Sequence, residues 1–329
     1  MTRSLRYLAF WVVAVPMFAV AWVQAAPQEA DTATITAPAD AQKTIEPKKF
    51  MRFVDDGHNG GRFETAIVTY RNKDGATVQL VGAIHIGEKS YYESLNRKFE
   101  SDDAVLYEMV KPKGTGAPQP GQKSDNPINQ LQHLMKDVLD LDFQLDDIDY
   151  SKPNFVHADM DAQTFQQMQE ERGETFEDLI LKQIKHALLD PDSKKQVQDI
   201  DTDKMIDSFV EVLTRPDMER QIKLAVARQM DKIEDTAMGM DNPNGSVIVT
   251  ERNKVALKVL KETLDKGKRH ISVFYGAAHM PDMSQRLRDM GFKPVSTEWE
   301  TAWDLSIRAN EPSAAERLLK EFLHALDDN

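Results

Sequence analysis

The chain has 329 residues, a formal net charge of -13 at pH 7 and no cysteine. Without cysteine the protein has no disulfide bond, no thiolate metal ligand, no cysteine nucleophile and no cysteine for lipid attachment. The excess of acidic side chains argues against binding to nucleic acid and against adhesion to anionic lipid.

The N-terminal segment has the composition of a secretory signal. Basic residues within 1–6 precede an uncharged apolar run at 8–23, and small residues follow it. We expect residues 1–25 to be a signal peptide and the protein to be exported, as a periplasmic or secreted protein. The alternative is an uncleaved segment that anchors the protein in the membrane. Residues 26–49 are rich in Ala, Pro, Thr, Asp and Gln, which predicts a disordered tether.

The remaining residues, 50–329, suffice for one large α/β domain or two smaller ones. Apolar residues recur at helical spacing through much of 127–240, which predicts a helical insertion in this region. An amphipathic helix is expected near the C-terminus, at 312–326.

One short motif occurs twice, at residues 82–90 and again at residues 276–284. Both copies begin Gly-Ala, have a histidine at the fourth position, and keep an acid and a serine at matching later positions. The histidines are His85 and His279, and an apolar run typical of a buried strand precedes each of them. Each histidine is therefore expected where a strand leaves the sheet.

A helical stretch and a second apolar run follow each copy, and each second run ends in a carboxylate. Glu108 ends the run at 104–108, and Glu298 ends the run at 294–298. Two such strand–helix–strand halves predict an α/β fold with a central mixed or largely parallel sheet. Because ligands bind at the carboxyl ends of parallel strands, we expect these carboxylates to join the two histidines at one rim.

Glu108 ends a run that should be fully buried. An isolated carboxylate in such a place must be paired, protonated or bound to a metal. Arg252, on a helix expected at 247–266, offers a planar donor for a carboxylate of the substrate or for Glu108. An ordinary surface pair is the alternative role for Arg252.

Three further features each have two interpretations. Ser90 is expected to cap a helix, with Glu93 completing a capping box, rather than to act as a nucleophile. His157 lies within a short apolar run at 154–160 and is either a structural histidine or a third histidine of the site. Residues 111–123 are rich in Pro and Gly and predict a loop that could cover the site as a lid or substrate rim.

The two histidine motifs, Glu108 between them, and the tripeptide Glu251-Arg252-Asn253 stand in an order that resembles the TraB/PrgY/GumN family, to which the Tiki proteins belong. The resemblance covers roughly residues 65–303. It implies a fold like that of the wider group containing erythromycin esterases and ChaN-type haem-binding lipoproteins. Family members often carry a glycine shortly after the second histidine, where this chain has Met280-Pro281-Asp282.

The resemblance to the Tiki branch implies a metal-dependent peptidase in which His85, His279 and Glu108 are site residues and Arg252 lies beside them. Imidazoles and carboxylates together suit manganese, cobalt or zinc, and a metal-bound water can attack a carbonyl. In this hypothesis His85, His279 and Glu298 are metal ligands. Glu108 is either a further ligand or the general base. Arg252 stabilises a carboxylate or the oxyanion.

Two other functions remain open from the sequence. A metal-free hydrolase of the erythromycin-esterase kind would use His85 and Glu108 directly for acid–base chemistry. A non-enzymatic protein would use the same residues to bind haem or another small ligand. The expected partners are a peptide or small-molecule substrate, with no nucleic acid.

Overall fold

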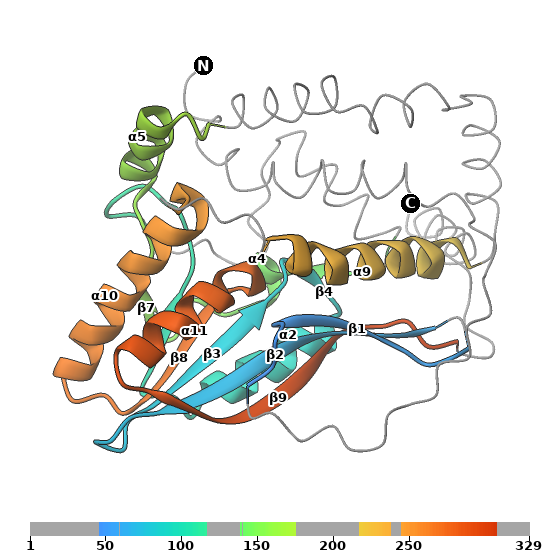
Figure 1. The fold of residues 1–329 in the computed structure, drawn as a ribbon, viewed down its shortest axis with the longest axis horizontal. Coiled ribbons are helices and arrows are strands. Elements are labelled where there is room, and N and C mark those ends of the chain that lie inside the picture. The colour runs from blue at the N-terminus through green and yellow to red at the C-terminus, as the bar shows by residue number, and fades with distance from the viewer. Residues whose placement is uncertain are drawn as a thin grey trace, which may run out of the picture.

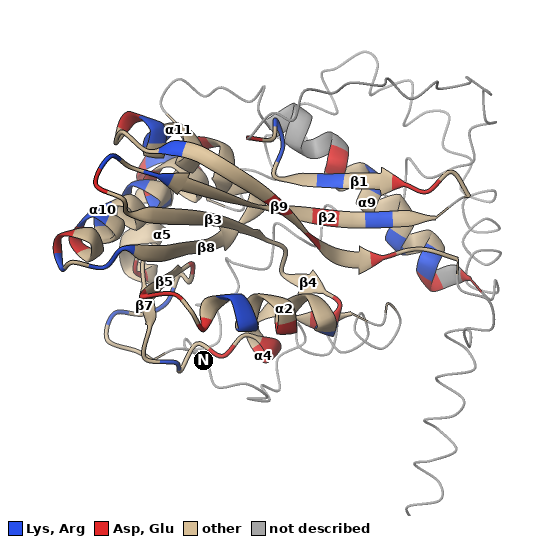
Figure 2. Ribbon diagram, turned by 90° about the horizontal axis from the view of Figure 1, so that it is seen from below, with Lys and Arg blue, Asp and Glu red and all other residues tan. Residues whose placement is uncertain are grey.

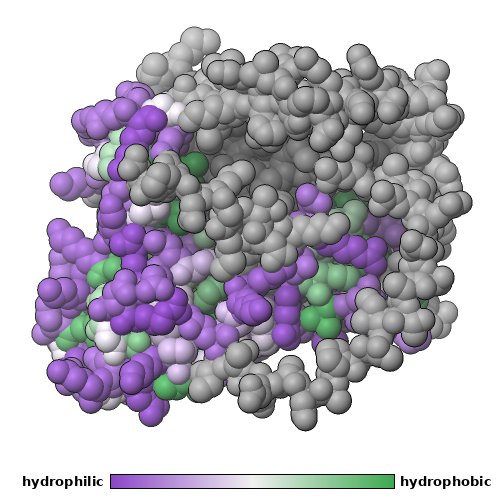
Figure 3. All heavy atoms as spheres, viewed as in Figure 1, coloured by the Kyte–Doolittle hydropathy of each residue, from purple (hydrophilic) through white to green (hydrophobic). Residues whose placement is uncertain are grey.

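The computed structural model describes residues 46–58, 60–116, 139, 141–175, 217–237 and 245–307. The predicted signal peptide, most of the tether, half of the helical insertion and the C-terminal helix lie outside these residues. No helix within the described ranges is long and apolar enough to cross a membrane. In Figure 3, hydrophilic side chains dominate the described surface around the helix at residues 252–265.

A mixed sheet forms the centre of the fold, with helices around it (Figure 1). Its strands are β1 (Met51–Asp55), β2 (Gly61–Arg71), β3 (Thr77–Ala83), β5 (Ala104–Tyr107), β7 (Phe155–His157), β8 (His270–Gly276) and β9 (Lys293–Asp304). The order is β1-β2-β3-β8-β5-β7, and β9 also pairs with β2. Strands β3, β8, β5 and β7 are parallel neighbours, whereas β2 is antiparallel to β1, β3 and β9. The predicted α/β class with a mixed sheet is confirmed.

The hairpin of β2 and β3 is formed as its turn sequence predicts. The side-chain oxygen of Asn72 accepts hydrogen bonds from the backbone amides of Asp74 and Ala76. Gly75 has φ of +80°, a left-handed conformation that glycine adopts without strain. This local chemistry fixes the register that brings the carboxyl end of β3, and hence His85, to its place.

Helices cover both faces of the sheet (Figure 2). One face carries α2 (Lys89–Phe99) and α4 (Gln144–Asp147), and the other carries α10 (Arg252–Asp265) and α11 (Met280–Asp289). The remaining described elements are β4 (Ile86–Gly87) and β6 (Asp142–Phe143), which pair with each other, α5 (Ala162–Arg172), α9 (Met218–Ala237), the π-helical turn η2 (Val247–Glu251) and the 3-10 turn η3 (Ala277–His279).

The two crossover connections leave the neighbouring strands β3 and β8 in opposite directions. The chain from β3 passes through α2 to β5 on the far side of β8, and the chain from β8 passes through α11 to β9 on the far side of β3. Because such crossovers are right-handed, their helices lie on opposite faces of the sheet. The loops after β3 and β8 therefore diverge, which is the arrangement that makes a ligand-binding crevice in open α/β sheets.

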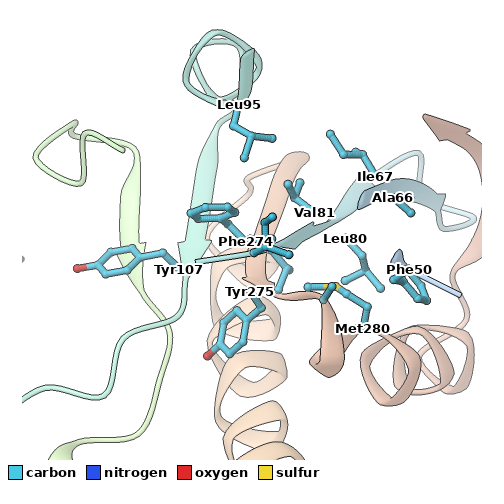
Figure 4. Packing of buried hydrophobic residues seen from close by; sticks show 14 of the residues in the cluster. Phe50, Ala66, Ile67, Leu80, Val81, Leu95, Tyr107, Phe274, Tyr275 and Met280 are labelled. Carbon is cyan, nitrogen blue, oxygen red and sulfur yellow. The ribbon is translucent and has the colours of Figure 1, made fainter. Parts of the chain in front are cut away.

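Both faces of the central strands are buried. Figure 4 shows Leu95 of α2 above one face, near Val81 and Phe274, and shows Leu80 and Met280 together on the other. All five side chains are essentially inaccessible to solvent. Complete burial of such a side chain contributes about 1.5–3 kcal/mol, so this packing holds the two motif-bearing strands rigidly side by side.

The second half of the predicted duplication is only partly formed as expected. The strand predicted at 294–298 is the longer β9, which pairs with β2 and is separated from β8 by β2 and β3. The end of β9 nevertheless holds the loop after His85, since Trp303 donates from Nε1 to the Ile86 carbonyl over 2.8 Å. The Asp304 amide donates to the Glu88 carboxylate over 2.8 Å.

One local prediction is wrong. Ser90 does not cap α2, because the helix begins at Lys89 and its N-cap is Glu88, whose carboxylate accepts a hydrogen bond from the end of β9. The last residues of the expected tether are held by the domain. Tyr70 donates its hydroxyl to Glu46 over 2.8 Å, and Lys49 donates to the Asp231 carbonyl over 2.9 Å.

Asp102, just before β5, gives the domain a pH-dependent stability. Its Oδ2 atom is buried with no hydrogen-bond partner among the described residues, and burial raises the pKa of this carboxyl to about 6. The group is protonated more readily in the folded chain than in the unfolded chain, where its pKa is 3.8. Its contribution to stability is therefore complete below pH 4 and is lost as the pH rises through 6.

We expect Asp102→Asn to raise the free energy of unfolding above pH 7 by about 1 kcal/mol, after allowance for partial exposure. Urea unfolding of both proteins between pH 4 and pH 8 measures this difference. The matched control is Asp103→Asn. Hydrogen bonds from the amides of Arg269 and His270 lower the pKa of Asp103, so this substitution should lower the free energy of unfolding above pH 7 rather than raise it. Parallel stability curves for wild type and Asp102→Asn would contradict the assignment.

Candidate active site

His85 lies just beyond β3 and is held by a side-chain amide. The Gln144 backbone amide donates to the His85 carbonyl over 3.0 Å, and Gln144 Oε1 lies 3.1 Å from His85 Nδ1. Gln144 Nε2 donates to the Tyr150 hydroxyl over 2.9 Å, so the amide oxygen is the end that faces the ring. Burial lowers the pKa of His85, although the Glu108 carboxylate opposes this shift. The ring is therefore neutral near pH 7, with its proton on Nδ1.

His279 is buried in η3, and a second amide holds it in the same way. Asn253 Oδ1 lies 2.6 Å from His279 Nδ1. The other end of this amide donates to the His279 carbonyl over 3.1 Å and to the Asp282 carboxylate over 2.7 Å. Since the Asn253 nitrogen is already donating, its oxygen accepts the proton of Nδ1. Tyr275 packs edge-on against the ring at 5.2 Å between centroids.

Glu108 follows β5 directly and accepts hydrogen bonds at both oxygens. Arg252 donates to Oε1 over 2.7 Å, and the Gly276 amide donates to Oε2 over 2.6 Å. His279 Nε2 lies 3.5 Å from Oε1. Burial would raise the pKa of this carboxyl, but the Arg252 guanidinium and then the His279 ring outweigh burial and hold the pKa well below its usual range. Glu108 is therefore a carboxylate at neutral pH.

Arg252 joins Glu108 to a second buried acid, Asp159. Arg252 donates to the two oxygens of Asp159 over 3.0 and 2.6 Å, from Nε and a terminal nitrogen. The side chains of Arg252 and Asp159 are 4% and 0% exposed. Arg252 begins α10 immediately after the π-helical turn η2, a distortion common at functional sites, and also donates to the Ile248 carbonyl in that turn.

The site residues converge on Gly276, the last residue of β8. A Cβ atom at Gly276 would lie 3.3 Å from Glu108 Oε2, 3.8 Å from His279 Cδ2 and 4.0 Å from His85 Nε2. The structure therefore brings His85, Glu108 and His279 together, with Arg252 behind Glu108. The convergence results from the parallel pairing of β3, β8 and β5, whose carboxyl ends meet at this edge.

Other predicted site residues lie elsewhere or have structural partners. Glu298 is on β9, with its side chain 55% exposed, and accepts a hydrogen bond from Lys98 of α2 over 2.7 Å. The strand continues past Glu298 to Asp304, so this residue is not at a strand end. His157 contacts the Met109 carbonyl through Nε2 at 2.7 Å. Residues 111–116 of the predicted lid are described, and 117–123 lie outside the described residues.

Three residues of the site escaped the sequence analysis. Asp159 looks like a helix cap, but Asp161 caps α5 and Asp159 binds Arg252 instead. Its place just beyond β7, a strand parallel to β5, is the signal that could have identified it. Asn253 is the third residue of the Glu-Arg-Asn tripeptide, whereas Gln144 has no signal in the sequence.

The implied metal can be tested against these positions. Within the described ranges, no three His, Asp or Glu side chains are grouped so that they could hold one metal ion. Glu108 is bound by Arg252, and a guanidinium beside a ligand carboxylate opposes the binding of a cation. The side chains as placed therefore do not fit a bound divalent metal.

Comparison of the chain with protein-family models, with curated proteins and with solved structures finds no match.

Removing Arg252 leaves two buried carboxylates without their cation. We expect Arg252→Met to lower the free energy of unfolding by about 3–5 kcal/mol, the usual cost of removing one partner of a buried ion pair. The control is Arg172→Met, which removes an ion pair of a partly exposed arginine with Glu251 and should cost less than about 1 kcal/mol. Urea unfolding at neutral pH compares the variants, and equal losses would contradict a special role for Arg252.

Proposed function

We propose that the protein is a hydrolase that activates water at His85, Glu108 and His279 to cleave a peptide or a similar amide. The convergence of these side chains on Gly276, at the carboxyl ends of three parallel strands, is the observation that supports it. The resemblance to the TraB/PrgY/GumN family supports the same residues from the sequence. In this proposal the protein is exported and meets its substrate outside the cytoplasm.

The chemistry of each side chain suits this reaction. His85 is neutral, so Nε2 can accept the proton of a water molecule. Glu108 is ionised and fixed at both oxygens, which allows it to orient the water and to stabilise positive charge on an imidazole. If His279 is neutral and its Nδ1–H donates to Asn253, then its Nε2 atom and Glu108 Oε1 are two acceptors 3.5 Å apart. A proton shared with Glu108, or a donor bound between them, removes this repulsion.

Arg252 has a narrower role than the sequence suggests. Its guanidinium donates hydrogen bonds to Glu108, to Asp159 and to the Ile248 carbonyl. We therefore assign it to holding and ionising Glu108 rather than to binding the oxyanion of an intermediate.

A metal-dependent form of the same hydrolase is the second candidate, as the resemblance implies. One observation favours it: both rings hold an Nδ1 proton on an amide oxygen, as outer partners often do for metal-binding histidines. In this candidate manganese, cobalt or zinc would be held by His85 and His279, with Glu108 as a further ligand, in side-chain positions other than those described above.

We expect Glu108→Gln to lower the rate of hydrolysis by about 100-fold to 1,000-fold, the usual cost of removing one preorganised electrostatic contact. A peptide library incubated with the purified protein and examined by mass spectrometry supplies the assay. The control Glu298→Gln changes an exposed carboxylate on β9 and should leave the rate unchanged. Full activity in Glu108→Gln would refute the proposed site.

Metal analysis of protein purified without a histidine tag distinguishes the two candidates. The metal-dependent form predicts stoichiometric metal in the wild type and its loss in both His85→Ala and His279→Ala, because each variant removes a ligand. The metal-free form predicts full activity after dialysis against a chelator. Stoichiometric metal in a protein that carries both substitutions would eliminate the metal site proposed here.

A further inference from the structure

The side chains of Asn253 and Gln144 occupy equivalent places behind the two histidines. Asn253 comes from the first turn of α10 and contacts His279, whereas Gln144 comes from the first turn of α4 and contacts His85. The elements lie on opposite faces of the sheet (Figure 2). Two unrelated segments therefore supply the same functional group, a carboxamide oxygen, to the same ring atom, Nδ1.

The bonds at the nitrogen end of Asn253 prevent its carboxamide from turning over. The Asn253 nitrogen donates to the His279 carbonyl and to Asp282, which also accepts a hydrogen bond from Arg286 over 2.7 Å. A flipped amide would place its oxygen against this carbonyl and this carboxylate, neither of which can donate. The Gln144 nitrogen donates to the Tyr150 hydroxyl, which leaves its oxygen facing His85.

We infer that Asn253 and Gln144 are positioning residues that fix His279 and His85 in the Nδ1-protonated tautomer, so that both Nε2 atoms are acceptors, that of His85 near Gly276 and that of His279 beside Glu108. The role of this tautomer in catalysis rests on the proposed hydrolase function. Asn253 and Gln144 add to that function by setting which ring nitrogen of each site histidine carries the proton. In water the Nε2-protonated tautomer is the more stable form of neutral imidazole, so the protein must hold the less stable one.

This tautomer determines what the site can bind. Nε2 of His85 and the Glu108 carboxylate lie near Gly276, and Nε2 of His279 lies beside Glu108, so this group of acceptors selects a group that donates hydrogen bonds. A water molecule meets this requirement, whereas an anionic group does not. The side-chain amides thus prepare the site for the nucleophile rather than for a negatively charged part of the substrate.

Nitrogen-15 NMR of the histidine rings tests the inference without any substrate. Long-range proton–nitrogen spectra at about pH 8, where an unperturbed imidazole is neutral, distinguish the two tautomers. Spectra of His85→Ala and His279→Ala assign the two rings. We expect both rings of the wild type to be Nδ1-protonated. Finding either of them Nε2-protonated in the wild type would overturn the inference.

Single substitutions then identify the residue responsible for each tautomer. Asn253→Ala should convert His279 to a mixture dominated by the Nε2-protonated form and leave His85 unchanged, and Gln144→Ala should do the reverse. Gln144→Glu keeps the acceptor oxygen and should preserve the tautomer of His85. The control Gln79→Ala removes an amide that bonds Thr69 and Ser272, and should alter neither ring.

The rate of hydrolysis separates the inference from the proposed function. Loss of an outer partner of a site histidine should lower the rate by about 10-fold to 100-fold in Asn253→Ala. A changed tautomer with an unchanged rate would count against the proposed function and leave the positioning role intact. An unchanged tautomer of His279 in Asn253→Ala would overturn the positioning role, whatever the rate.

Discussion

The arrangement of the site depends on one guanidinium, that of Arg252, between two buried carboxylates. Glu108 and Asp159 are 5% and 0% exposed, and a carboxylate buried without a cation is strongly destabilising. One arginine satisfies both, and in doing so it joins the end of β5, the segment after β7 and the start of α10. The same ion pairs that hold three segments together also keep Glu108 ionised beside His279.

The topology of the sheet explains why the site lies where it does. Because the connections after β3 and β8 run to opposite faces, the first residues beyond these strands lie where the two connections diverge. The two Gly-Ala motifs occupy that position. Gly276 suits the centre of the crevice because any side chain there would occupy the space that Glu108 and the two histidines share. The loop after His85 is fixed separately, by Trp303 at the end of β9.

The sequence correctly predicts features that depend on local pattern. Prediction fails for a strand or a side chain whose partner is distant in the sequence. Strand periodicity and the repeated motif correctly place His85, His279 and Glu108 at one edge of the sheet. The same reasoning puts Glu298 at that edge, and it fails because strand order and strand length are decided by pairing with β2, which no pattern within residues 294–298 reveals. Asp159 is missed because its place before α5 suits a helix cap, the role that Asp161 has in the structure.

Charge balance explains why amides rather than carboxylates support the histidines. Glu108, Asp159 and Arg252 together already carry a net negative charge in a buried environment. A third carboxylate against Nδ1 of His279 would add a buried negative charge with no cation to offset it, at a cost of several kcal/mol. Asn253 supplies the acceptor without the charge. The acid that binds Asn253 is Asp282, which contacts the amide rather than the ring and is paired with Arg286. The site can therefore orient two imidazoles precisely while a single arginine suffices to stabilise its buried acids.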